Sequence, residues 1–300
     1  MSVNLQVNIG GLVMKNPVTV GSGTFGYGQE YDRYYDISRL GAVTVKSLSL
    51  TPRAGNPPPR LVETPAGMLN AIGLQNVGID VYLSEKLPWL RERGCTIIAN
   101  IYGHTPDEYG QLAERLERGG GADAIEANLS CPNVHNARNA GGCKLVAQSP
   151  ERVTEYTRIV KSATKLPVFV KLSPNVMDIT EPALAAQEAG ADAISLINTL
   201  LGMGINPETR RPILSNMVGG LSGPAIRPVA VKMVWDAARA VKIPVIGMGG
   251  ICNADDAMQF ILAGARAVAV GCASFRKPDT ALCVVQGLED YCVRHGVADI

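Results

Sequence analysis

The sequence predicts an α/β fold, a (β/α)8 TIM barrel with an N-terminal β-hairpin and a long loop after its second strand. Three observations predict it: eight short apolar runs, helical patterns between them, and a helix-to-strand junction that almost repeats. The chain has 300 residues, a length that α/β barrels reach as one domain. We therefore expect a single domain over residues 1–300.

The first predicted element is a β-hairpin. Val3–Ile9 and Leu12–Met14 flank Gly10-Gly11, and paired glycines suit a tight two-residue turn. Because the hairpin precedes the first barrel strand, we expect it to plug the bottom of the barrel.

The eight apolar runs are predicted to be parallel strands. Most are rich in β-branched residues and apolar on both faces, as strands covered by helices should be. They are Val18–Gly21, Ala42–Lys46, Thr96–Asn100, Ala124–Asn128, Val168–Leu172, Ala193–Ile197, Val245–Met248 and Ala267–Gly271.

The stretches between the strands have helical periodicity. Thr105-Pro106, Ser149-Pro150 and Asn253 supply caps or first-turn residues for three of them. Examples are Asp107–Arg118, Pro150–Ala163, Pro182–Ala189, Pro228–Ala240 and Ala254–Ala263.

Three helix-to-strand junctions have almost the same sequence, at Gly121–Ile125, Gly190–Ile194 and Gly264–Val268. The glycine suits a left-handed helix C-cap, and the small residues after it let the strand begin at once. By contrast, Ser47–Pro88 has three consecutive prolines and no clear repeat, so we predict one large loop there. Loops of that length in a compact domain are commonly functional.

Composition excludes several classes of protein. The 28 Lys and Arg residues nearly balance the 27 Asp and Glu residues, which argues against a nucleic-acid partner held by charge. The sequence has no run of 18 apolar residues and no signal peptide, so we expect no membrane association. Seven scattered cysteines without a C-x-x-C pair indicate free thiols in the cytoplasm. The three histidines have no metal-ligand spacing, and no metal site is expected.

Polar residues stand where most of the predicted strands end. Working residues of TIM barrels lie at the C-terminal ends of the strands. Lysine and asparagine at such inward positions need partners once they lose water, which favours a functional site. These strand ends are Gly21–Gly23, Lys46-Ser47, Asn100, Asn128–Cys131, Lys171, Asn198-Thr199, Gly249-Gly250 and Gly271-Cys272.

The last two strand ends predict a phosphate site. Gly249-Gly250 and Gly271 leave room for backbone N–H groups to close on an anion, as they do in many barrels. The alternative is that these glycines only form tight turns.

Cys131 differs from the other cysteines because polar residues surround it after the fourth strand. Pro132 prevents a helix from starting there, so the thiol lies on an irregular loop at the barrel mouth. No histidine lies nearby in the sequence, so the arrangement of a cysteine protease is incomplete. The remaining functional role for this thiol is that of a proton acceptor. The alternative is that Cys131 is an inert buried cysteine.

Motifs spread over essentially the whole chain carry a family resemblance. They are Lys46-Ser47, Gly55–Arg60, Gly67–Asn76, Asn128–Asn133, Val170–Asn175, Asn198-Thr199, Gly219–Pro224 and Gly247–Ile251. On these residues the chain resembles the dihydroorotate dehydrogenase family, specifically its class 1B catalytic subunit. The resemblance implies a flavoprotein oxidoreductase that binds one FMN per subunit and oxidises dihydroorotate to orotate in pyrimidine (UMP) biosynthesis.

The resemblance also implies a role for each residue at the strand ends. Cys131 would be the base that takes the C5 proton while hydride leaves C6 for flavin N5. FMN would contact Ser22, Lys46, Ser47, Asn100, Asn128, Lys171, Ile197 and Gly223, with its phosphate on Gly249, Gly250, Gly271 and Cys272. The substrate would contact Lys46, Asn70, Ala71, Ile72, Gly73, Leu74, Asn128, Asn133, Asn198 and Thr199.

The class assignment implies partners. Membrane-associated class 2 members have serine in place of the cysteine, whereas class 1A members share the cysteine and reduce fumarate. Asn198–Met203, Gly219–Pro224 and Lys171–Asn175 resemble class 1B. That class pairs with a subunit that carries FAD and a [2Fe–2S] cluster and reduces NAD⁺, with a dimer of catalytic subunits inside a heterotetramer.

Alternative functions remain open at this point. A dihydropyrimidine dehydrogenase-like flavoprotein shares the barrel and the cysteine loop, and a class 1A fumarate-linked enzyme shares the reaction. Asn70–Asn76 and Asn198-Thr199 favour dihydroorotate as the substrate. Two alternatives would not be redox enzymes. One is a barrel that only binds a phosphorylated metabolite, and the other is a scaffold without catalysis.

Overall fold

The computed structural model describes residues 3–130 and 146–300. Its eight-stranded sheet has the order β3-β16-β15-β10-β9-β8-β7-β4, with every pair parallel. All eight predicted strands are confirmed, with ends within two residues of those expected. They are β3 (Val18–Val20), β4 (Val43–Leu48), β7 (Ile97–Ile101), β8 (Ala124–Asn128), β9 (Val168–Lys171), β10 (Ala193–Leu196), β15 (Val245–Met248) and β16 (Ala267–Val270).

The barrel is nearly closed between β3 and β4, the two ends of the strand ladder. The hydroxyl oxygens of Thr19 on β3 and Thr44 on β4 lie 2.9 Å apart, and both side chains are buried. This hydrogen bond joins the two edge strands across the seam. Since all strands run in one direction, their C-terminal ends open at the same mouth.

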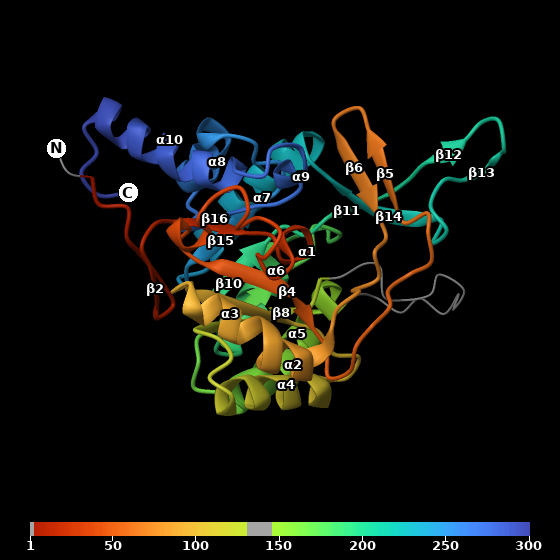
Figure 1. Ribbon diagram of the computed structural model, residues 1–300, viewed down its shortest axis with the longest axis horizontal. Coiled ribbons are helices and arrows are strands. Elements are labelled where there is room, and N and C mark those ends of the chain that lie inside the picture. The colour runs from red at the N-terminus through yellow and green to blue at the C-terminus, as the bar shows by residue number, and fades with distance from the viewer. Residues whose placement is uncertain (1–2, 131–145) are drawn as a thin grey trace.

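Helices cover the outside of the sheet (Figure 1). The predicted caps are confirmed: Thr105, Ser149 and Asn253 each accept a hydrogen bond from a backbone N–H in the first turn of their helix. The helices of more than four residues are α3 (Leu87–Glu92), α4 (Pro106–Arg118), α5 (Pro150–Ser162), α6 (Thr180–Glu188), α7 (Arg227–Ala240), α8 (Ala254–Leu262) and α10 (Thr280–His295). Short helical segments are α1 (Ser22–Phe25), α2 (Gly78–Val81) and α9 (Ala273–Arg276).

The N-terminal hairpin closes the opposite end of the barrel, as predicted. Its strands are β1 (Val7–Ile9) and β2 (Leu12–Met14), which pair antiparallel. Their buried side chains pack on apolar residues at the N-terminal ends of the barrel strands, among them Ile98, Ala124 and Phe169. This end of the barrel is therefore filled by apolar side chains.

The prediction of one large loop over Ser47–Pro88 is wrong. The segment contains β5 (Leu61–Thr64), β6 (Gly67–Asn70), α2 and a π-helical turn over Tyr82–Lys86. β5 and β6 form a hairpin that pairs with β14 (Val218–Ser222) and β11 (Leu200–Met203) in a four-stranded antiparallel sheet.

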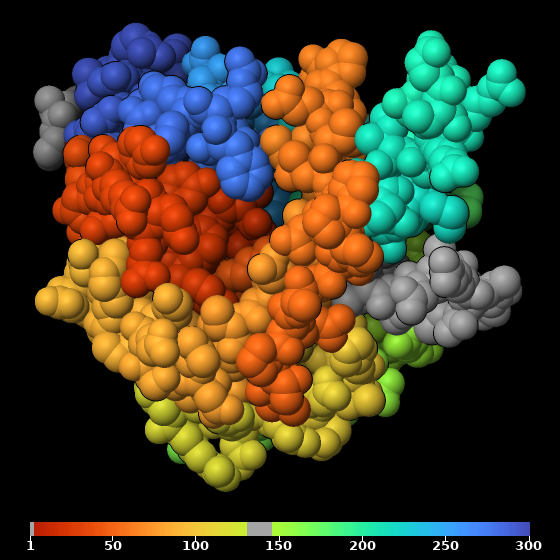
Figure 2. Space-filling view, turned by 45° about the vertical axis from the view of Figure 1, so that its right-hand side comes forward, coloured from red at the N-terminus to blue at the C-terminus, as the bar shows by residue number. Residues whose placement is uncertain are grey.

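The physical reason for this error is that the strands of the small sheet are short and only half-buried. Leu61–Thr64 alternates between exposed and half-buried positions, and β6 meets its second partner through pairs such as Leu69–Leu221, remote in the sequence. In the space-filling view the β5–β6 hairpin stands beside the C-terminal helices (Figure 2). Beyond it projects an arm with β12 (Ile205–Asn206) and β13 (Arg211–Pro212).

Several ionisable groups are buried in the core around the barrel. Burial raises the pKa of the Cys95 thiol from 9.0 to about 11, with Asp32 and Asp36 adding to the shift. Burial likewise raises the pKa of Tyr27 and of Tyr31 to about 12.

Across the described residues, no helix is long and apolar enough to cross a membrane.

We predict that the protein loses stability in alkali before its surface tyrosines ionise. The folded state keeps Cys95 protonated, whereas the unfolded chain releases this proton near pH 9.0, so the free energy of unfolding falls as pH rises above that value. The contribution of Cys95 that is lost by pH 11 is about 2 kcal/mol. Urea unfolding between about pH 8 and pH 11 measures this loss, and Cys95→Ala should show a shallower decline. Equal slopes in the two proteins would contradict the assignment to Cys95.

Candidate active site

A cavity of about 320 Å³ lies at the C-terminal ends of the barrel strands. Small-molecule sites have volumes of roughly 300–1,000 Å³. Among the described residues, five barrel strands (β4, β8, β9, β15 and β16) contribute to its wall, as do the residues directly after β3 and β10. Strands β5, β6 and β14 of the small sheet also line it. The mouth of the barrel is therefore a walled site rather than an open surface.

Most of the residues expected at the site lie together around this cavity. Asn100 and Ala71 are fully buried and do not line it, and Cys131 and Asn133 lie outside the described residues. The expected residues that line it are Ser22, Lys46, Ser47, Asn70, Ile72, Gly73, Leu74, Asn128, Lys171, Ile197, Asn198, Thr199, Gly223, Gly249, Gly250, Gly271 and Cys272.

Glycine backbone forms one end of the cavity. Gly250 has φ +77°, and a Cβ there would lie 2.6 Å from the carbonyl oxygen of Gly223, so this close approach requires glycine. Gly271 has no such constraint: a Cβ at Gly271 would meet no described atom within 4 Å. Open space above Gly271 thus borders backbone that can present N–H donors to an anion.

Cys272 lies at the same end and keeps it free of negative charge. Burial raises the pKa of its thiol above the ordinary value of 9.0, an effect that outweighs the opposing hydrogen bond with Ser222. A protonated thiol does not repel an anion. The nearby guanidinium of Arg227 forms an ion pair with Asp256, at 2.6 Å from Nη1 to Oδ1.

Amide side chains in the cavity are held by one another. Asn198 donates from Nδ2 to the Ser130 hydroxyl at 2.8 Å, and that hydroxyl donates to Asn128 Oδ1 at 2.9 Å. Asn128 Nδ2 in turn lies 3.4 Å from the Ser47 hydroxyl, to which it donates. These bonds join the ends of β4, β8 and β10, so the amide groups have fixed orientations before any ligand binds.

A buried charge pair lies at the floor of the cavity. Lys171 on β9 and Glu126 on β8 are 5% and 2% exposed, and Lys171 Nζ lies 3.6 Å from Glu126 Oε1. Sequence analysis missed Glu126. Its signal was a carboxylate within the apolar strand Ala124–Asn128, two residues from Asn128 and therefore on the same face.

The segments that flank the β5–β6 hairpin supply two further wall residues that the sequence did not single out. Arg60 directly precedes β5, donates to the backbone oxygens of Ala54 and Asn56, and contacts the Gln75 side chain. Both Arg60 and Gln75 line the cavity. Arg60 ends the Gly55–Arg60 motif, so a signal for it was present.

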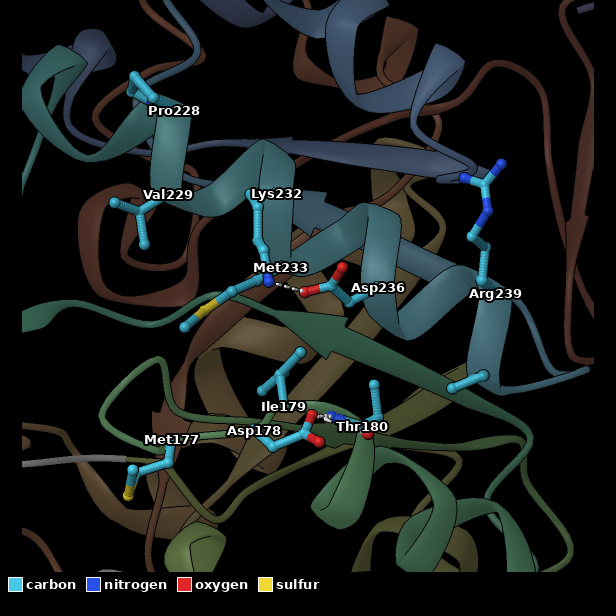
Figure 3. Close-up of a pocket in the computed structure, with 11 residues that line it drawn as sticks. Met177, Asp178, Ile179, Thr180, Pro228, Val229, Lys232, Met233, Asp236 and Arg239 are labelled. Atoms are coloured by element: carbon cyan, nitrogen blue, oxygen red, sulfur yellow. Dashed lines mark hydrogen bonds and ion pairs between the residues drawn. The ribbon is translucent and has the colours of Figure 1, made fainter.

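A wider groove of about 920 Å³ lies on the outside of the barrel, between α7 and the segment that leads into α6 (Figure 3). Four of its polar residues are already paired: Lys232 pairs with Asp236, and Asp178 accepts two hydrogen bonds from Thr180. Met177 and Val229 are exposed beside them.

Within residues 3–130 and 146–300, no group of three or more His, Cys, Asp or Glu side chains is arranged to hold a metal ion. The cavity at the strand ends is therefore the candidate active site.

Comparisons with known proteins match the chain to one family. The family model described as dihydroorotate dehydrogenase matches residues 4–291. The catalytic subunit of dihydroorotate dehydrogenase B (NAD(+)) from Desulforamulus reducens is 54% identical, and the match covers 100% of this chain and 97% of that subunit. The subunit of the same name from Geotalea uraniireducens is 52% identical, over 99% of this chain and 96% of its own. A crystal structure of the dihydroorotate dehydrogenase from Eimeria tenella with ferulenol has a TM-score of 0.80 at 25% identity, and the match covers 98% of this chain and 86% of that one.

Proposed function

The chain belongs to the dihydroorotate dehydrogenase family, and from that premise we propose that it oxidises (S)-dihydroorotate to orotate on a bound FMN. In this proposal it is the catalytic subunit of an NAD-linked enzyme of pyrimidine biosynthesis. The observation that carries the proposal is a single cavity that combines a glycine-lined end, two lysines and a set of fixed amides.

The residues of the cavity fit FMN. The space above Gly271 would accept the phosphate beside backbone N–H groups. Lys171 lines the cavity and donates no hydrogen bond to a described residue, so a charged donor remains for a polar ring. When bound, FMN supplies the acceptor for the hydride that leaves dihydroorotate C6.

Lys171 would act electrostatically. A fixed ammonium in a site without water stabilises negative charge far more than it does in solution. Held at the pyrimidine edge of the flavin, Lys171 would favour the anionic reduced form.

Lys46 and the amides would bind the substrate. Asparagine side chains offer both donors and acceptors, which suits the imide groups of a pyrimidine ring. The Lys46 ammonium would offset the carboxylate that distinguishes dihydroorotate from uracil and thymine. Lys46 therefore favours this substrate over those of a dihydropyrimidine dehydrogenase-like enzyme.

Cys131 would be the general base that takes the proton from C5. It is the residue after Ser130, whose hydroxyl is fixed between Asn128 and Asn198 in the cavity. A base must lie within hydrogen-bond reach of the proton that it removes, so this assignment requires the Cys131 thiol to reach C5 of the substrate.

Electrons would leave through a partner. The words "catalytic subunit" in the names of the relatives imply a second subunit. We assign FAD and a [2Fe–2S] cluster to that subunit, in a heterotetramer built on a dimer of catalytic subunits in the cytoplasm.

Filling the space above Gly271 should abolish FMN binding. Gly271→Leu places a side chain in open space without straining the backbone, so the folded protein should keep its thermal stability in the absence of FMN. The purified variant should be colourless, as measured by flavin absorbance per chain. Gly250→Leu is the contrasting variant, since the strain at φ +77° should also lower its stability. Normal FMN content in a folded Gly271→Leu protein would contradict the phosphate assignment.

Removing the base should separate binding from chemistry. Cys131→Ala should retain FMN and bind orotate, while flavin reduction by dihydroorotate slows by roughly 10²–10⁴-fold, because a positioned base is lost. Cys131→Ser should recover activity only at higher pH, since a hydroxyl is a poorer proton acceptor. Stopped-flow absorbance measures the rates. A wild-type rate for Cys131→Ala at neutral pH would transfer the role to another group, with Lys46 the first candidate.

The isolated chain should reduce an artificial dye with dihydroorotate but should not reduce NAD⁺. The sequence has no cluster of cysteines for iron. Its G-x-G-x-x-G, Gly21–Gly26, follows β3 but lines the candidate active site and opens only the four-residue helix α1, so it does not form the strand–loop–helix unit that binds a dinucleotide. Steady-state assays with a dye, fumarate or NAD⁺ as the electron acceptor test this prediction. Rapid NAD⁺ reduction by the pure chain would contradict the assignment to the B type, and rapid fumarate reduction would favour class 1A.

A further inference from the structure

A buried carboxylate lies directly beneath the floor of the cavity. Glu126 is 2% exposed and does not line the cavity, so it touches no ligand there. Its Oε1 accepts a hydrogen bond from Asn100 Nδ2 at 2.5 Å, and its Oε2 accepts one from the Ser195 hydroxyl at 2.6 Å. Both donors are fully buried, on β7 and β10.

The same carboxylate is the described counter-charge of Lys171. The register of β8 and β9 sets Asn128 opposite Lys171, so Glu126 lies one step of the pleat deeper on the same face as Asn128. Nζ to Oε1 is 3.6 Å, which is close for an ion pair and long for a hydrogen bond. The ammonium is thus held from below while its N–H donors remain available on the cavity side.

Packing alone does not explain a charge at this position. Neighbouring interior residues such as Ala124 and Phe169 are apolar, and burying a carboxylate costs free energy unless it is paired and hydrogen-bonded. Glu126 meets both conditions because Asn100, Ser195 and Lys171 surround it. Of these four residues only Lys171 lines the cavity, and Glu126 balances its charge.

We propose that Glu126 is a positioning residue that fixes the Lys171 ammonium and partly neutralises it, and so lowers the reduction potential of the bound FMN. This inference rests on the proposed function. Alone, Lys171 would strongly favour the anionic reduced flavin. With a carboxylate behind it the preference is smaller, and electrons pass more readily to the partner subunit.

The test is the midpoint potential of bound FMN, measured by spectroelectrochemistry without substrate. Glu126→Gln keeps the shape of the side chain and removes its charge. We expect the preference for reduced over oxidised flavin to rise about tenfold, which corresponds to a potential about 30 mV more positive for two electrons. Lys171→Gln should shift the potential in the opposite direction.

Ser195→Ala provides the matched control. It removes a hydrogen bond to the same carboxylate at a similarly buried site but leaves both charges, so the preference should change by less than about twofold. A role in packing alone would make the two variants alike. Glu126→Asp keeps the charge and draws it away from Lys171, so it should give a smaller shift in the same direction, and it decides the question if Glu126→Gln does not fold.

An unchanged or more negative potential in Glu126→Gln, or in Glu126→Asp where that variant is used, would overturn the inference. These outcomes differ from a failure of the proposed function. A wild-type chain that binds no FMN or does not oxidise dihydroorotate would refute that function. A wild-type chain that does both, with a potential insensitive to Glu126, would refute only the role of Glu126.

Discussion

The closure of eight parallel strands into one barrel is the constraint on which the site depends. Because every strand runs in the same direction, residues as distant as Ser22 and Cys272 meet at one mouth. The Thr19–Thr44 hydrogen bond joins the edge strands, and the N-terminal hairpin fills the other end with apolar side chains. The polar residues of the interior are consequently gathered at the mouth, where a ligand can use them.

Buried charge gives that mouth its chemical character. The interior has a low dielectric, so Lys171 and Glu126 interact strongly, and each offsets part of the cost of burying the other. Asn100 and Ser195 complete the hydrogen bonds of the carboxylate, while the Asn198–Ser130–Asn128 chain fixes the amides above it. The contacts that offset the free-energy cost of burying these polar groups also hold them in position for a substrate and a cofactor.

The second sheet shows how remote segments complete the site. The β5–β6 hairpin and the β11–β14 pair come from opposite halves of the chain and meet through contacts such as Leu69–Leu221. Together with the strand ends they wall the cavity, and they add Arg60 and Gln75 to it. The barrel therefore supplies the chemistry, and the antiparallel sheet supplies much of the enclosure.

The sequence by itself determined the eight strands, the capped helices, the hairpin and most of the cavity residues. These features depend on local signals: apolar runs, Thr105 and similar caps, and glycines such as Gly250 that a close backbone approach requires. Only the tertiary structure decided that Ser47–Pro88 forms strands, that Asn100 and Ala71 lie behind the cavity wall, and that Glu126 faces Lys171. The physical reason is that strand pairing and charge pairing join residues far apart in the sequence, and a local pattern contains no record of the partner.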